Sequence, residues 1–131
     1  MRRLFLCLGG EYAGDDLALE ICGALKGKIK NADFLKCEDP FEIPDHVKSE
    51  GKVAGEVVII DVVKGLGKAR IFDGVDEFEK TRSVSAHDLD ACTVLKLLET
   101  MEGRRFRIIG VPMGSEKAGI AEDVMKLISS L

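Results

Sequence analysis

Short apolar runs alternate along the chain with longer segments in which apolar residues recur at helical spacing. The runs are typical of strands buried on both faces, and they span residues 4–8, 32–37, 57–63 and 107–111, with 69–72 as an edge strand. Strands that alternate with helices favour a parallel sheet covered on both sides. The pattern therefore predicts an α/β fold: a three-layer sandwich with a largely parallel sheet of about five strands and helices on both faces.

Three amphipathic segments predict the main helices, at residues 15–26, 86–102 and 118–131. The second follows Ser85-Ala-His-Asp88, which resembles a capping box, and ends at Gly103. Residues 39–55 contain two prolines, so only a short helix that is capped by Asp45 and ends at Ser49 is expected there. The apolar residues expected to face the sheet are Leu17, Ile21 and Leu25, then Ala91, Val94, Leu95, Leu98 and Met101, then Ile120, Val124, Leu127, Ile128 and Leu131.

Composition narrows the class of protein. A length of 131 residues suits a single domain over 1–131, and we expect a monomer. A net charge of −4 excludes a basic surface for nucleic acid or acidic lipid. No apolar run approaches the ~20 residues of a membrane span, and the run at 4–8 is too short for a signal peptide of ~7–15 apolar residues. These features predict a cytoplasmic protein without membrane insertion.

The four cysteines are Cys7, Cys22, Cys37 and Cys92, and no two of them form a CxxC pair. Metal clips and disulfide frameworks usually show close, repeated cysteine spacing. We therefore expect reduced thiols in the core rather than disulfides or a zinc site.

The loop after the first strand, LGGEYAGDD, is rich in glycine and leads into a helix, as phosphate-binding loops do. It carries Glu11, Asp15 and Asp16 but no lysine or arginine, and three carboxylates would repel a phosphate. One of the two adjacent aspartates is expected to cap the helix, which leaves the other to face a cleft.

Asp61 and His87 are the other candidates for chemistry. Asp61 is the only polar residue in the strand VVIIDVV, where its charge requires either backbone amides at the strand end or a bound cation. His87 lies in the first turn of a helix, as a site residue or as an exposed residue; His46 is interpreted as a surface residue. Asp16, Asp61 and His87 together form an O,O,N set of ligands suited to a divalent transition metal near the strand ends. A nucleophilic serine is disfavoured, because no serine lies in a GxSxG turn.

At these residues the chain resembles the hydrogenase maturation endopeptidases, which trim the C-terminal tail from the large subunit of nickel-iron hydrogenases. The matching segments are LFLCLGGEYAGDD with Asp16 as the second acid, VVIIDVVKG with Asp61, SVSAHDLDACTVLKLLE with His87, and RIIGVPMGSE. The chain departs from the family pattern at Gly10, at Leu17, over residues 37–55 and at Lys68-Ala69.

The resemblance implies an aspartyl-type, nickel-dependent endopeptidase whose partner is a hydrogenase large-subunit precursor. It implies that Asp16, Asp61 and His87 are both the catalytic and the metal-binding residues, and that the nickel is supplied by the precursor. The alternative is a module of the same fold that binds nickel or the partner without cleaving it.

Overall fold

A five-stranded sheet forms the centre of the computed structural model, which describes residues 2–9, 16–49, 55–81 and 86–131; for 81 and 86–90 it describes the backbone only. The strand order is β2 (Ala32–Cys37), β1 (Arg3–Leu8), β3 (Glu56–Val63), β5 (Arg107–Pro112), β4 (Arg70–Phe72). The first four strands are parallel, and β4 pairs antiparallel with β5 at the edge. The largely parallel sheet and the edge position of the strand at 69–72 are thus confirmed.

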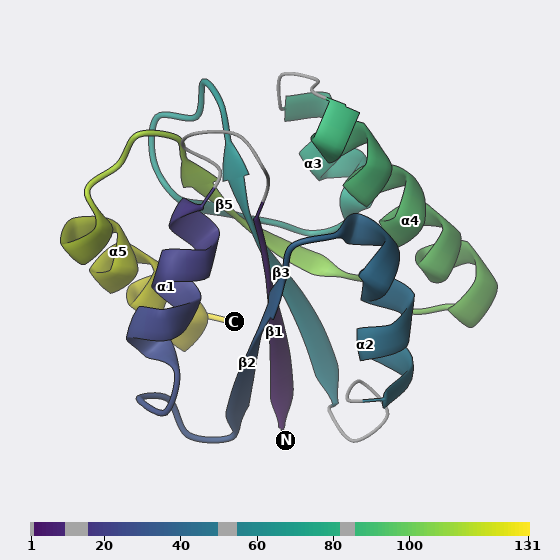
Figure 1. The fold of residues 1–131 in the computed structure, drawn as a ribbon, viewed down its shortest axis with the longest axis horizontal. Coiled ribbons are helices and arrows are strands. Elements are labelled where there is room, and N and C mark those ends of the chain that lie inside the picture. The colour runs from purple at the N-terminus through teal and green to yellow at the C-terminus, as the bar shows by residue number, and fades with distance from the viewer. Residues whose placement is uncertain (1, 10–15, 50–54, 82–85) are drawn as a thin grey trace.

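Helices cover both faces of this sheet, as Figure 1 shows. Helices α1 (Leu17–Leu25) and α5 (Lys117–Ser129) lie on one face. Helices α2 (Ile43–Ser49), α3 (Val75–Thr81) and α4 (Ala86–Glu102) lie on the other, and the short 3-10 helix η1 (Pro40–Glu42) leads into α2. The predicted three-layer sandwich is confirmed.

Two apolar cores fill the spaces between the layers, and β3 contributes to both. Side chains of a strand alternate between its faces. Val57, Ile59 and Val63 pack in the core under α2, α3 and α4, whereas Val58, Ile60 and Val62 pack in the core under α1 and α5. By this alternation Asp61 belongs to the face that carries α2, α3 and α4.

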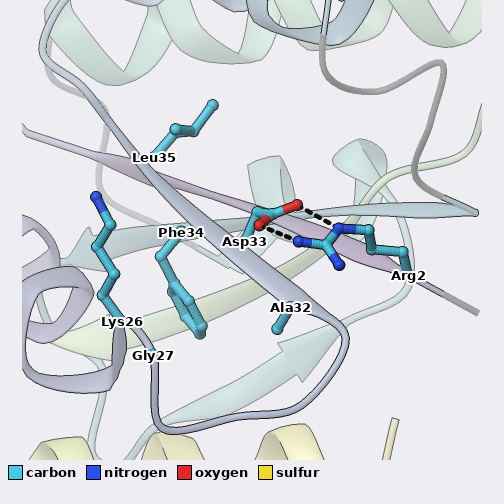
Figure 2. A pocket seen from close by; sticks show the side chains of 7 residues that line it. All are labelled: Arg2, Lys26, Gly27, Ala32, Asp33, Phe34 and Leu35. Atoms are coloured by element: carbon cyan, nitrogen blue, oxygen red, sulfur yellow. Dashed lines mark hydrogen bonds and ion pairs between the residues drawn. The ribbon is translucent and has the colours of Figure 1, made fainter.

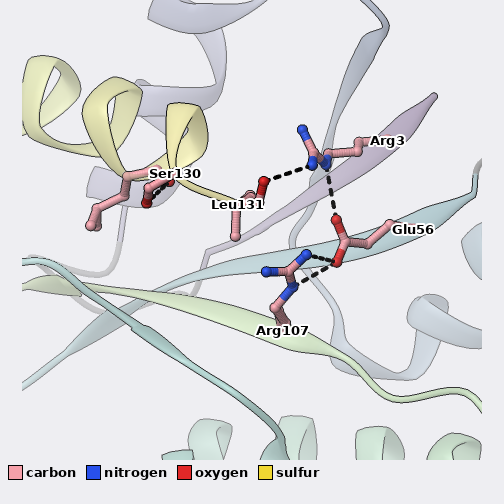
Figure 3. A network of polar contacts seen from close by, with 6 residues as sticks. Arg3, Glu56, Arg107, Ser130 and Leu131 are labelled. Carbon is pink, nitrogen blue, oxygen red and sulfur yellow. Dashed lines mark hydrogen bonds and ion pairs between the residues drawn. The ribbon is translucent and has the colours of Figure 1, made fainter. Parts of the chain in front are cut away.

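A network of charged groups joins the amino-terminal ends of three parallel strands, β1, β3 and β5 (Figure 3). Glu56 at the start of β3 accepts hydrogen bonds from Arg3 Nε at 2.9 Å and from Arg107 Nε at 2.6 Å. Arg3 Nη2 also donates to the backbone oxygen of Leu131 at 3.1 Å. The network therefore ties β1, β3, β5 and the C-terminal segment together.

Three details of the helices differ from the predictions. Asp45 does not cap the short helix but lies in the first turn of α2; the cap is on the preceding 3-10 helix η1, where Asp39 Oδ1 accepts from the Phe41 amide at 2.9 Å. Pro40 follows the cap and starts the helical turn earlier than expected. Helix α3 was not predicted, and Met101 is 78% exposed in the last turn of α4 instead of facing the sheet.

The prediction of reduced thiols in the core is confirmed, because all four cysteines are free and buried. The proposed capping box falls partly outside the described residues, since Ser85 is not among them. Over the part of the chain that the structure describes, no helix is both long enough and apolar enough to cross a membrane.

Candidate functional site

The order of the strands marks one position at the edge of the sheet as the natural binding crevice. The chain passes from β1 through α1 to β2 on one side, and then returns through α2 to β3 on the other side of β1. In open parallel sheets, ligands bind outside the carboxyl ends of the strands at such a reversal. The crevice is therefore expected beyond the ends of β1 and β3.

Asp61 lies near the carboxyl end of β3, one of the two strands that flank this reversal. Its side chain is 3% exposed, and it is the only charged residue classed as buried among those the structure describes. Its Oδ1 accepts a hydrogen bond from the Val62 amide at 2.9 Å. One backbone amide near the strand end thus supplies part of the hydrogen bonding that a buried carboxylate needs, as in the first of the two alternatives drawn from the sequence.

Asp16 immediately precedes α1, which begins at the same edge of the sheet (Figure 1). It occupies the N-cap position, and its backbone oxygen accepts from the Glu20 amide at 3.0 Å. Its side chain makes no capping hydrogen bond and is exposed. The Asp16 carboxylate therefore does not cap the helix, and it is available for a role in a cleft. Asp15, the other candidate for the cap, lies outside the described residues.

His87 is the second residue of α4, which also begins at this edge and on the face of the sheet that carries Asp61 (Figure 1). Its side chain lies outside the described part of the structure. The backbone thus brings the start of α4, the start of α1 and the end of β3 to one edge of the sheet. The convergence of the Asp16, Asp61 and His87 side chains stays a prediction.

A different set of side chains has the spacing of metal ligands. Within the described residues, one group of three is found, in which ligand atoms of Cys37, Glu42 and His46 all lie within 4.8 Å of one another. His46 is half-buried rather than a simple surface residue, and Cys37 is fully buried. This group was not predicted from the sequence; the signal that could have indicated it is the four-residue spacing of Glu42 and His46 along one helical segment.

One surface hollow lies away from the crevice. It lies near the start of β2 and the end of α1, where Lys26, Gly27 and Phe34 line it beside the ion pair of Arg2 and Asp33 (Figure 2). The two Arg2–Asp33 hydrogen bonds measure 2.6 Å each. This ion pair already satisfies both charges, so the hollow offers little chemistry for catalysis.

Comparison with known proteins points to the hydrogenase maturation proteases. A family model described as hydrogenase maturation protease matches residues 41–129, which include Asp61 and His87. No curated protein matches the sequence significantly.

Several solved structures share the fold over nearly the whole chain. The [NiFe] hydrogenase maturation protease HybD from Thermococcus kodakarensis is 24% identical, with a TM-score of 0.68, over 99% of this chain and 97% of that protein. The hydrogenase maturating endopeptidase HybD from E. coli is 16% identical, with a TM-score of 0.68, over 99% of this chain and 91% of the other. The [NiFe] hydrogenase maturation protease HycI from Thermococcus kodakarensis KOD1 is 19% identical, with a TM-score of 0.66, over 98% and 90%.

Proposed function

This chain belongs to the hydrogenase maturation protease family, and we propose that it is the endopeptidase that removes the C-terminal extension of a nickel-iron hydrogenase large-subunit precursor after nickel insertion. In this proposal it acts as a monomer in the cytoplasm, once on each precursor. The observation that carries the proposal is the buried carboxylate of Asp61, near the end of a strand that flanks the reversal in strand order.

The physical basis is a metal ion that arrives with the substrate. Nickel held by the precursor would take carboxylate oxygens from Asp16 and Asp61 and an imidazole nitrogen from His87. A cation beside Asp61 offsets part of the cost of burying its charge, whereas a nickel-free precursor provides no such compensation. Binding is then selective for a metal-loaded substrate, because the difference in affinity depends on the ion.

Docking through the metal would also place the scissile peptide. A peptide held next to the crevice reacts in an effectively unimolecular step, which lowers the entropic part of the barrier. The nickel would either polarise the scissile carbonyl or activate a water molecule. Asp16 is exposed at the edge of the crevice and suits the role of a ligand that is completed only when the substrate arrives.

The test compares a nickel-loaded with a nickel-free large-subunit precursor, each incubated with purified protein and weighed by mass spectrometry. We expect wild type to shorten only the nickel-loaded precursor, and Asp16→Asn and Asp61→Asn to lose most of this activity. Asp123→Asn is the matched control, since Asp123 is an exposed aspartate on α5. It should cleave as wild type does.

The results also separate cleavage from binding alone. Cleavage that depends neither on nickel nor on Asp16 would contradict the proposed mechanism. If the nickel-loaded precursor binds and is never shortened, the chain is the non-catalytic binding module instead.

A further inference from the structure

Three side chains with different ligand chemistry meet where β2 ends and α2 begins. Cys37 is the last residue of β2, Glu42 is the last residue of η1, and His46 lies in α2. One sulfur, one carboxylate oxygen and one ring nitrogen from these residues all lie within 4.8 Å of one another. The three residues have no part in the function proposed above.

The local sequence explains why the three meet. Asp39 accepts from the Phe41 amide, and the Glu42 amide donates to the Asp39 oxygen at 3.0 Å, so the chain turns sharply after β2. Pro40 favours this turn because its φ is already helical. Glu42 and His46 are four residues apart on the continuous η1–α2 segment, which places them on one face. The turn brings that face back to Cys37.

We propose that Cys37, Glu42 and His46 bind a Zn²⁺ ion. A thiolate, an imidazole and a carboxylate are the ligand types of zinc sites, whereas Ca²⁺ and Mg²⁺ prefer oxygen ligands alone. A thiolate and a carboxylate together neutralise the two charges of the ion, which favours a site at the boundary of the core. Three protein ligands leave a fourth position for water.

The metal-free protein keeps the thiol in its protonated form. Burial, followed by the negative charges of Glu42 and Asp39, raises the pKa of Cys37 to about 12. The thiol donates to the Asp39 backbone oxygen at 3.2 Å. Zinc therefore has to displace this proton into solvent, and the thiolate that binds the ion gives up its hydrogen bond to the Asp39 oxygen.

The zinc site is separate from the crevice that carries Asp61. Strand β1 lies between β2, which carries Cys37, and β3, which carries Asp61. Neighbouring strands are roughly 4.8 Å apart, so two strand spacings separate the two sites. The zinc proposal and the peptidase proposal thus rest on different ligands, and either can fail alone.

Cobalt titration of the purified full-length protein tests the site, because Co²⁺ bound to a thiolate gives a charge-transfer absorption band that oxygen and nitrogen ligands do not give. We expect a band that saturates at one Co²⁺ per chain and disappears when Zn²⁺ is added. Glu42→Gln and His46→Ala should weaken binding by at least about tenfold. Cys37→Ser should abolish the band.

Two controls make the result decisive. Cys92→Ala removes a cysteine of equal burial, 1% exposed, that is not in the cluster, and it should keep the band. Asp61→Asn should also keep it, since it alters only the other site. The proposal is overturned if wild type gives no band or if the band survives in Cys37→Ser. It is also overturned if His46→Ala and Glu42→Gln, shown to be folded by circular dichroism, bind Co²⁺ as wild type does.

Discussion

Glu56 offers a quantitative test of how the sheet is stabilised. It is paired in register with Arg3 of β1 and also contacts Arg107 of β5, so that one carboxylate bridges three adjacent strands (Figure 3). The exposed fractions of the three side chains are 16% for Glu56, 27% for Arg3 and 31% for Arg107. The substitution Glu56→Gln keeps the shape of the side chain and removes its charge.

The expected loss follows from this partial burial. Exposed ion pairs contribute about 0–1 kcal/mol, while hydrogen bonds to charged groups contribute about 1.5–3 kcal/mol. Gln retains one acceptor oxygen but places an NH₂ group against one of the two guanidinium groups. We therefore expect the free energy of unfolding to fall by about 2 kcal/mol. For a domain of this size, that corresponds to a decrease of roughly 6–10 °C in Tm.

Urea and thermal unfolding, followed by circular dichroism, measure the change directly. Asp33→Asn is the matched control, since the Arg2–Asp33 pair also makes two short hydrogen bonds but its side chains are 48% and 44% exposed (Figure 2). It should lower Tm by less than Glu56→Gln does. Equal losses in the two variants, or a change below about 0.5 kcal/mol for Glu56→Gln, would refute the argument from burial.

Two further predictions concern glycine packing and a surface carboxyl. Gly110→Ala should destabilise the fold by about 1–3 kcal/mol, because the new Cβ would lie 2.7 Å from the buried Phe72 ring. Gly23 is an exposed residue of α1, and its new Cβ would meet nothing within 4 Å, so Gly23→Ala should stabilise the fold by about 0.5–1 kcal/mol. Urea unfolding that gives both changes the same sign would contradict this. The hydrogen bond from Arg2 lowers the pKa of Asp33 below its ordinary value. The ion pair therefore stabilises the fold fully above the ordinary pKa of the carboxyl, and this stabilisation is lost as the pH falls through the lowered pKa. Carboxyl NMR should show that the titration midpoint of Asp33 rises in Arg2→Ala.

The sequence predicted the parts of the fold that depend on strong, continuous patterns. Buried runs such as 57–63 are unambiguous, because polar residues are almost absent and the runs are too short for helices. Helix α3 was missed because, of its residues whose side chains are described (75–80), only Val75 and Phe78 belong to the buried core. A helix this short is stabilised by tertiary contacts, here the edge-to-face packing of Phe78 on Phe72, and its own sequence pattern is weak.

The candidate site was predictable only to the level of the backbone. Asp16 and Asp61 could be placed near the strand ends, since Asp16 follows the first strand and Asp61 lies near the end of the clearest one. The meeting of Cys37 with Glu42 and His46 was not predictable, because it depends on the cap at Asp39 and on the path of the chain after β2. Spacing along the chain reveals ligands on one helix, and it does not reveal a ligand that a turn brings to that helix.

The two histidines lie on helices that touch each other, and this affects how metal binding should be interpreted. Helix α2, with His46, packs against α4, which carries His87 in its first turn. Zinc at Cys37, Glu42 and His46 would fix α2 to the end of β2, and would thereby support the helix that presents His87. Loss of peptidase activity in a His46 variant would then not identify His46 as a ligand of the substrate nickel. Only paired measurements on Cys37 and Asp61 variants, one for the cobalt band and one for nickel-dependent cleavage, can assign each ion to its own site.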